Sequence, residues 1–282
     1  MKGGYFLLNG QFYKEQDAVF RLADLDCLFE GFSETFRAEH NEILFQKSIS
    51  NHLLATAESI GVDLTGLIDP DGRMLRKDVS RLLNKNKLYQ AARIGIQIYP
   101  SDSQVNILLR AEETERGYYP IKEPGLLLSF YYDHLKGIQP SAAYSTSGFF
   151  ISQGAKRMAA ALNQSNMILL NSEKNCCECI DGSFAYLNNE EVIFPALGSG
   201  GYRCAILEEI IHSALRAGFK PKEQETITTD DLLDAEELFL FDTCNGIQKV
   251  LGLEERRYYS TKTQLIAREL SELAKKDREE KT

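Results

Sequence analysis

Residues that could carry out chemistry are concentrated in the second half of the chain. Cys176, Cys177 and Cys179 surround Glu178 in the run Cys-Cys-Glu-Cys, and the turn Gly-Ser-Gly-Gly at 198–201 leads into an apolar, helix-like segment. Thiols can bind a metal ion or react as thiolates. The amide groups of a turn that opens a helix can bind an anion. We therefore look for the candidate site in this region first.

Two chemistries are disfavoured by the spacing of these residues. A structural zinc site usually has four well-spaced ligands, and no second cysteine pair follows Cys-Cys-Glu-Cys. The four histidines, His40, His52, His134 and His212, do not form a recognisable nucleophile motif with any serine or cysteine. We expect no metal site, and we expect the cysteines to be reduced and structural.

The composition is that of a folded, acidic protein. With 282 residues, 43% of them hydrophobic, the chain can bury a large core and is long enough for two domains. The 32 Lys and Arg residues are outnumbered by 41 Asp and Glu residues, which argues against nucleic-acid binding. No apolar run approaches the roughly 20 residues that cross a bilayer, and charges interrupt the start of the chain where a signal peptide would be apolar. We expect a cytoplasmic protein that binds neither nucleic acid nor membrane.

The first half of the chain shows an α+β pattern. The Asn9–Gly10 pair between two apolar runs predicts a β-hairpin. Ile49, Leu53, Ala57 and Ile60 are near helical spacing and predict an amphipathic helix after a short strand. The other expected elements are a helix at 74–88 and strands at 91–100 and 103–113.

A segment with two prolines and no regular pattern, at 115–125, separates the two halves. We expect an N-terminal α+β domain at 1–117, a linker at 118–124 and a C-terminal domain at 125–282. In the second half we expect strands at 126–133, 165–175, 182–196 and 235–246, a strand-like run that begins at Ser141, and helices at 153–164, 203–218 and 263–281. The charged end of the last helix is expected to be frayed and solvated.

Four local motifs follow one another along the chain. They are LNGQFY near the start, LFEGFSETFR at 28–37, the run at 168–203 around Glu178 and the Gly-rich turn, and AEELFLFDTCNGIQKV at 235–250. In this order they resemble the class IV aminotransferase family, which uses pyridoxal phosphate and includes branched-chain aminotransferases, D-amino-acid aminotransferases and aminodeoxychorismate lyase. Glu30, Gly31, Glu34 and Thr35 align with the family's G-D-G-x-F-E-T segment. The resemblance implies a small N-terminal α/β domain, a larger β-rich C-terminal domain flanked by helices, and a homodimer.

The resemblance also implies roles for individual residues. Glu178 aligns with the carboxylate that keeps the cofactor's pyridine nitrogen protonated, so that the ring can accept electrons. Gly200, Gly201 and Tyr202 align with the turn that binds the cofactor phosphate, and Thr243 aligns with a hydroxyl on the same phosphate. Without the resemblance, Glu178 is read as a solvated hairpin residue and the turn as an ordinary loop.

Two groups that carry the family's chemistry are missing. Ser145 aligns with the lysine that forms a Schiff base with the cofactor, and a hydroxyl cannot replace an amine in that role. His52 aligns with the arginine that binds the cofactor phosphate; it could still donate a hydrogen bond to the phosphate, but it carries no charge by default. Ser183 and Asp24 stand where the family has an asparagine and an arginine. The resemblance therefore implies that pyridoxal phosphate binds weakly or not at all.

A shifted alignment leaves other lysines open. Lys136 or Lys156 could replace the missing amine, whereas Lys47 and Lys249 are expected to be exposed surface charges.

Three hypotheses follow. The first is a protein that has lost transamination and keeps an interdomain cleft for a small anionic metabolite, such as an amino or keto acid, or for a partner. The alternative is an active pyridoxal-phosphate-dependent aminotransferase or aminodeoxychorismate lyase-like enzyme with a displaced lysine. The third is a different enzyme that reuses the cleft without the cofactor.

Overall fold

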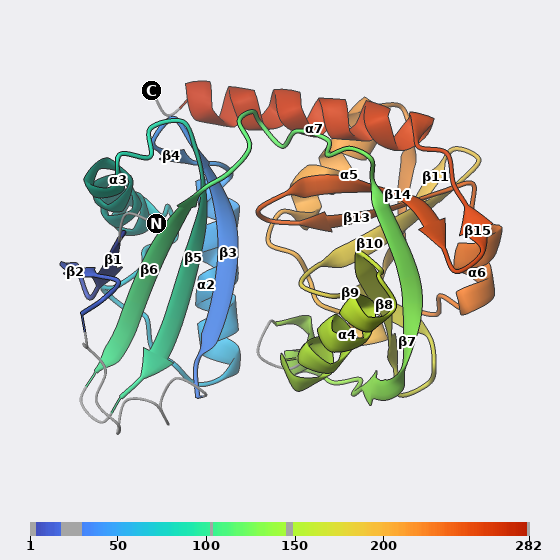
Figure 1. Cartoon of the computed structure of the whole chain (residues 1–282), viewed down its shortest axis with the longest axis horizontal. Coiled ribbons are helices and arrows are strands. Elements are labelled where there is room, and N and C mark those ends of the chain that lie inside the picture. Colours follow the sequence, from blue (N-terminus) through green and yellow to red (C-terminus); the bar gives the residue numbers. More distant parts are fainter. Residues whose placement is uncertain (1–3, 18–29, 102–103, 145–148, 281–282) are drawn as a thin grey trace. The chain divides into compact units, whose positions relative to one another are not determined.

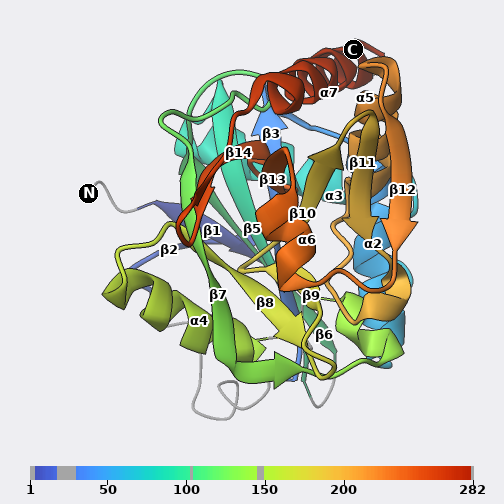
Figure 2. The same ribbon diagram turned by 90° about the vertical axis from the view of Figure 1, so that its right-hand side faces the viewer.

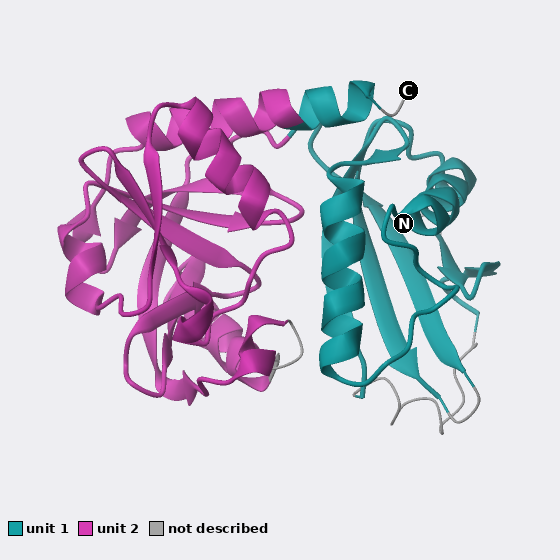
Figure 3. Cartoon of the chain, turned by 180° about the vertical axis from the view of Figure 1, so that it is seen from behind, with its two compact units in different colours: residues 1–118, 274–282 teal, residues 119–273 magenta. Residues whose placement is uncertain are grey.

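The computed structural model describes residues 4–17, 30–101, 104–144 and 149–280. These residues form two compact units (Figures 1 and 3). Unit 1 contains residues 1–118 and 274–282, and unit 2 contains residues 119–273. No helix in the described part of the chain is long and apolar enough to cross a membrane.

The described part of unit 1 contains an antiparallel six-stranded sheet that packs against helices α2 (Gln46–Ser59) and α3 (Arg73–Asn86). In sheet order the strands are β2 (Gln11–Lys14), β1 (Tyr5–Leu8), β6 (Val105–Glu113), β5 (Ala91–Pro100), β3 (Phe32–Glu39) and β4 (Glu42–Ile43). The predicted hairpin is confirmed, because β1 pairs with β2 across Asn9 and Gly10, both of which have positive φ. Helix α2 packs beside β3, and α3 beside β1 and β6. The predicted stripe is confirmed for Ile49, Leu53 and Ala57, which are the buried apolar residues of α2, whereas Ile60 follows the end of the helix and is half-buried.

Unit 2 is built on a nine-stranded mixed sheet. In sheet order the strands are β12 (Lys220–Gln224), β11 (Glu191–Pro195), β10 (Ser183–Asn188), β13 (Glu237–Asp242), β14 (Gly246–Leu253), β7 (Leu126–Lys136), β8 (Asn166–Asn171) and β9 (Cys176–Cys179), with β15 (Arg256–Arg257) on β14. The pairs β14–β7, β7–β8 and β11–β12 are parallel. The helices are α4 (Phe149–Ala161), α5 (Leu207–Arg216), α6 (Thr229–Asp234) and α7 (Thr261–Glu279).

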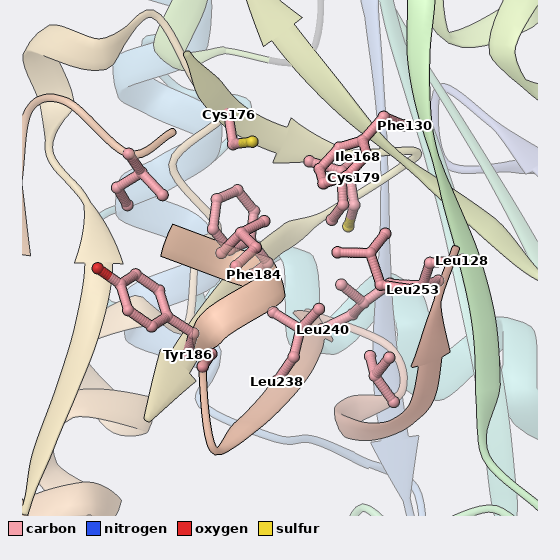
Figure 4. Close-up of a cluster of buried hydrophobic side chains, with 14 of the residues drawn as sticks. Leu128, Phe130, Ile168, Cys176, Cys179, Phe184, Tyr186, Leu238, Leu240 and Leu253 are labelled. Carbon is pink, nitrogen blue, oxygen red and sulfur yellow. The ribbon is translucent and has the colours of Figure 1, made fainter. Parts of the chain in front are cut away.

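Strands β7 and β8 are apolar on both faces. Phe130 and Ile168 enter the main core, which also receives Phe184, Leu240 and Leu253 from the neighbouring strands (Figure 4). The alternate residues of β7 and β8 pack under α4, which lies beside both strands (Figure 2). Burial on two faces explains why both strands read as continuous apolar runs. Each fully buried side chain of this kind contributes about 1.5–3 kcal/mol.

Three local expectations are wrong. The residues after Gln139 form a short 3₁₀ helix (Pro140–Ala143) rather than a strand, because Pro140 favours the first turn and Ala142 N–H bonds back to Gln139 O at 2.9 Å. Lys249 is buried, with its Nζ 2.5 Å from an oxygen of Glu123. The charged end of α7 remains helical to Glu279 and makes defined contacts in unit 1.

Candidate functional site

The centre of the candidate site in unit 2 is a buried ion pair between Lys136 and Glu178. Lys136 is the last residue of β7 and Glu178 lies on β9, so β8 separates their strands. The Lys136 ammonium donates to Glu178 Oε2 and, at 2.8 Å, to the carbonyl oxygen of Ala142. The two side chains are only 2% and 4% exposed. A charge buried this deeply is stable only beside a group of opposite charge. Here Lys136 and Glu178 are each other's partner.

A β-bulge turns Glu178 toward the interior. Strand β9 pairs Cys176 with Leu170 and Glu178 with Leu169, which leaves Cys177 as an extra residue between them. The extra residue interrupts the alternation of inward and outward side chains. All four residues of Cys-Cys-Glu-Cys are consequently buried, and the expectation of a solvated glutamate in a surface hairpin is wrong.

The Gly-rich turn lies directly against this strand. Gly200 has φ +80°, and a Cβ on Gly201 would lie 1.9 Å from the carbonyl oxygen of Cys177. Only glycine permits such a close approach of two backbones. The approach allows Tyr202 N–H to donate to Glu178 Oε2 at 2.6 Å. The structure therefore brings Gly200, Gly201, Tyr202 and Glu178 together.

Two buried side chains hold the turn in place. Asn171 Nδ2 donates to the carbonyl oxygen of Ser199 at 2.9 Å, and Ser183 Oγ donates to that of Tyr202 at 2.6 Å. Ser183 thus fastens β10 to the turn. The sequence analysis missed Asn171, because an asparagine at the end of a strand is usually read as a turn residue.

Electrostatics at the pair are dominated by desolvation. Burial raises the pKa of Glu178, whereas the Lys136 ammonium and the Tyr202 N–H oppose the rise by stabilising the carboxylate. Burial also raises the pKa of the neighbouring Cys177 thiol, and the charge of Glu178 adds to this effect. Both thiols that flank Glu178 are buried and free of disulfides. These cysteines are poor nucleophiles in the folded state.

Thr243 also lies in unit 2, at the end of β13. Its Oγ1 is 3.4 Å from Cys204 Sγ, and its carbonyl oxygen accepts a hydrogen bond from Tyr119 at 3.1 Å. Asp242 forms the turn that follows, accepting from the N–H groups of Cys244 and Asn245.

His52 belongs to unit 1, where its Nε2 is 3.2 Å from Glu34 Oε1. Ser145 and Asp24 both lie outside the described residues. Among the described residues, no group of three or more His, Cys, Asp or Glu side chains could hold a metal ion.

The family model for class IV aminotransferases matches residues 31–253, so the chain belongs to the class IV aminotransferase family. The similar solved structures include a branched-chain aminotransferase from Thermoproteus uzoniensis with norvaline, at 19% identity and a TM-score of 0.82 over 98% of this chain and 97% of that one. They also include a hypothetical aminotransferase from Mycobacterium tuberculosis in a PLP-bound form. It has 13% identity and a TM-score of 0.82 over 98% of this chain and 100% of that one. The branched-chain aminotransferase of Escherichia coli matches at 16% identity and a TM-score of 0.78 over 94% of this chain and 92% of that one.

A search of curated protein sequences gives no significant match. The structural likenesses confirm the fold class expected from the sequence, a two-part α+β fold of the class IV aminotransferase type.

The described residues do not fit pyridoxal phosphate in their present arrangement. Glu178, the expected partner of the pyridine nitrogen, is already bonded to Lys136 and Tyr202. The Tyr202 amide, expected on the cofactor phosphate, is the same group that donates to Glu178. Two of the implied cofactor contacts are thus made within the protein.

Proposed function

We propose that this chain is a non-transaminating member of the class IV aminotransferase family that binds a small anionic ligand, an amino acid or a keto acid. One observation carries the proposal: the carboxylate that should hold the cofactor ring is bonded to groups of the chain itself. The alignment of Ser145 with the Schiff-base lysine supports it. Transamination needs both a lysine that forms the Schiff base and a carboxylate that holds the cofactor ring. We infer that neither group is available for this role.

The ligand class rests on the relatives. One solved relative contains norvaline, and another is an alpha-ketoglutarate- and PMP-bound form of the Mycobacterium tuberculosis protein. Norvaline and alpha-ketoglutarate both carry carboxylate groups. We extend this class of ligand, and the homodimer implied by the resemblance, to the present chain.

A second candidate function is favoured by Lys136 itself. It is a buried amine in the same site as Glu178, and a displaced Schiff-base lysine would have to be an amine in this site that can reach the cofactor's aldehyde. In that case the protein is an active aminotransferase or aminodeoxychorismate lyase-like enzyme. The two candidates differ in whether a lysine reacts with the cofactor's aldehyde.

The test is a titration of the purified protein with pyridoxal phosphate, followed by borohydride reduction and peptide mass analysis. We expect no stoichiometric lysine adduct and no amino transfer from norvaline to α-ketoglutarate. Calorimetric titration without cofactor is expected to show saturable binding of one of these two acids. The matched control is Lys156→Met, because Lys156 is a half-exposed lysine paired with Asp181. A stoichiometric adduct on Lys136 that disappears in Lys136→Met but not in the control, together with turnover, would establish the second candidate.

A further inference from the structure

Lys136 is bonded to the carboxylate that the resemblance assigns to the pyridine nitrogen of the cofactor. Its Nζ is within hydrogen-bond distance of Glu178 Oε2, on the side of the carboxylate. In pyridoxal phosphate the ring nitrogen and the carbon that bears the aldehyde are opposite each other on the ring. A lysine bonded to the aldehyde carbon is therefore separated from the carboxylate by the width of the ring. Lys136 makes direct contact with the carboxylate, which is the contact that a ring nitrogen would make and not the one that a Schiff-base nitrogen would make.

The ammonium also matches the ring nitrogen in charge and in hydrogen bonding. A protonated pyridine presents one positive N–H donor to the carboxylate, and a lysine ammonium can present the same. A second contact of Lys136 holds its ammonium in this position, since Ala142 O accepts from Nζ at 2.8 Å. Ala142 belongs to the 3₁₀ helix that follows β7, which fixes this carbonyl near the end of the strand.

We propose that the Lys136 ammonium is a built-in substitute for the pyridinium nitrogen of pyridoxal phosphate, neutralising Glu178 so that the site is complete without the cofactor. The inference rests on the proposed function, because it concerns the same site in a protein that does not transaminate. It adds a specific reason why the cofactor is not bound: the Lys136 ammonium takes the place of the ring nitrogen beside Glu178 and so excludes the ring. An uncompensated Glu178 would otherwise be costly to bury.

The inference predicts that removing the ammonium restores a place for the ring. The probe is pyridoxine 5′-phosphate, which has an alcohol in place of the aldehyde and cannot form a Schiff base with any lysine. Binding is measured by calorimetry and by the absorption of the bound ring, which distinguishes protonated from neutral pyridine. We expect Lys136→Ala to bind the probe at least ~10-fold more tightly than the wild type, with the ring protonated. Lys156→Ala is the matched control and is expected to bind like the wild type.

A second variant tests whether the gain depends on Glu178. In Lys136→Ala/Glu178→Gln the carboxylate is gone, so the gain in affinity and the protonated spectrum are expected to disappear. This double variant also removes both members of the buried pair, and we expect its Tm to exceed that of Lys136→Ala. If Lys136→Ala does not fold, the Tm comparison is made with Lys136→Met and Lys136→Met/Glu178→Gln. Failure of the double variant to recover would then overturn the pairing.

The inference is overturned if a folded Lys136→Ala binds the probe no better than the wild type, or if the wild type already binds it with a protonated ring. The proposed function fails in a different experiment, by a lysine adduct with pyridoxal phosphate in the wild type. Because the probe has no aldehyde, the two failures cannot be confused.

Discussion

At the scale of single residues, unit 2 places reactive side chains where they cannot react. Burial raises the pKa of Cys176 to about 12 and that of Cys177 further, and the charge of Glu178 contributes at Cys177. Cys177 Sγ also donates to the carbonyl oxygen of Leu169. A thiol attacks only as the thiolate, which is scarce at a pKa so far above the pH of the solution. The cysteines around Glu178 therefore serve as core residues.

This leads to a prediction for thiol labelling. At pH 8 the native protein is expected to be alkylated by iodoacetamide at Cys176 and Cys177 at least ~100-fold more slowly than the urea-unfolded chain, because burial limits both access and ionisation. The rate is followed by mass analysis of the peptide that carries both residues. Rapid labelling of Cys177 in the folded protein would contradict the arrangement of β9 described above.

The sequence predicted that Glu178 and the Gly-rich turn belong to one site, and they lie side by side in the structure, but their hydrogen-bond partners could not be predicted. A sequence motif gives only the types of residues and their spacing, and this chain has the family's spacing between Glu178 and the Gly-rich turn. The partner of Glu178 is set by the bulge in β9 and by the point at which β7 ends, and neither leaves a pattern in the sequence. For this reason Lys136 remained one of two alternatives, although a lysine at the end of a buried apolar strand was a signal in its favour.

At the scale of elements, the Gly-rich turn is defined by how closely it approaches β9. The contact between Gly201 and the carbonyl of Cys177 places Tyr202 N–H on Glu178. Elements with a clear apolar pattern, such as the helical stripe of α2 and the continuous apolar run of β8, were predictable. Strand β12 was not, because Lys-Pro-Lys-Glu-Gln has no apolar pattern and is held only as the edge strand beside β11.

We expect Gly201→Ala to destabilise the protein by about 1–3 kcal/mol, because the new methyl group overlaps a backbone carbonyl that cannot move freely. The control is Gly198→Ala in the same turn, where the nearest atom to an added Cβ is 3.7 Å away. The control is expected to change stability by no more than ~0.5 kcal/mol. Urea unfolding of both variants measures the difference. Equal stabilities would mean that the turn does not press against β9.

At the scale of the whole molecule, α7 is shared by the two units. It begins in unit 2, where Glu237 accepts hydrogen bonds from Lys262 N–H at 2.9 Å and Thr263 N–H at 2.7 Å. A carboxylate at this end of a helix is favourable, because the first amide groups have no partner within the helix. The last residues of α7 belong to unit 1, where Asp277 accepts from Phe45 N–H at 2.8 Å and Arg278 donates to Tyr118 at 2.7 Å. The charged end of the sequence, expected to be solvated, is thus part of the packing of unit 1.

The Asp277 contact predicts a local effect in unit 1. Phe45 precedes α2 with φ +52°, and the Asp277 carboxylate accepts the N–H of this left-handed residue. Asp277→Ala removes that acceptor, and we expect a loss of about 1–3 kcal/mol together with faster hydrogen exchange in the first turn of α2. Glu280→Ala is the control, because Glu280 is an exposed carboxylate near the same end of α7 that makes a long, 3.9 Å ion pair with the exposed Lys276. Exchange in β8 and β9 of unit 2 should be unchanged in both variants, since the lost contact lies within unit 1. If Asp277→Ala behaves like Glu280→Ala, the end of α7 does not stabilise unit 1 through Phe45.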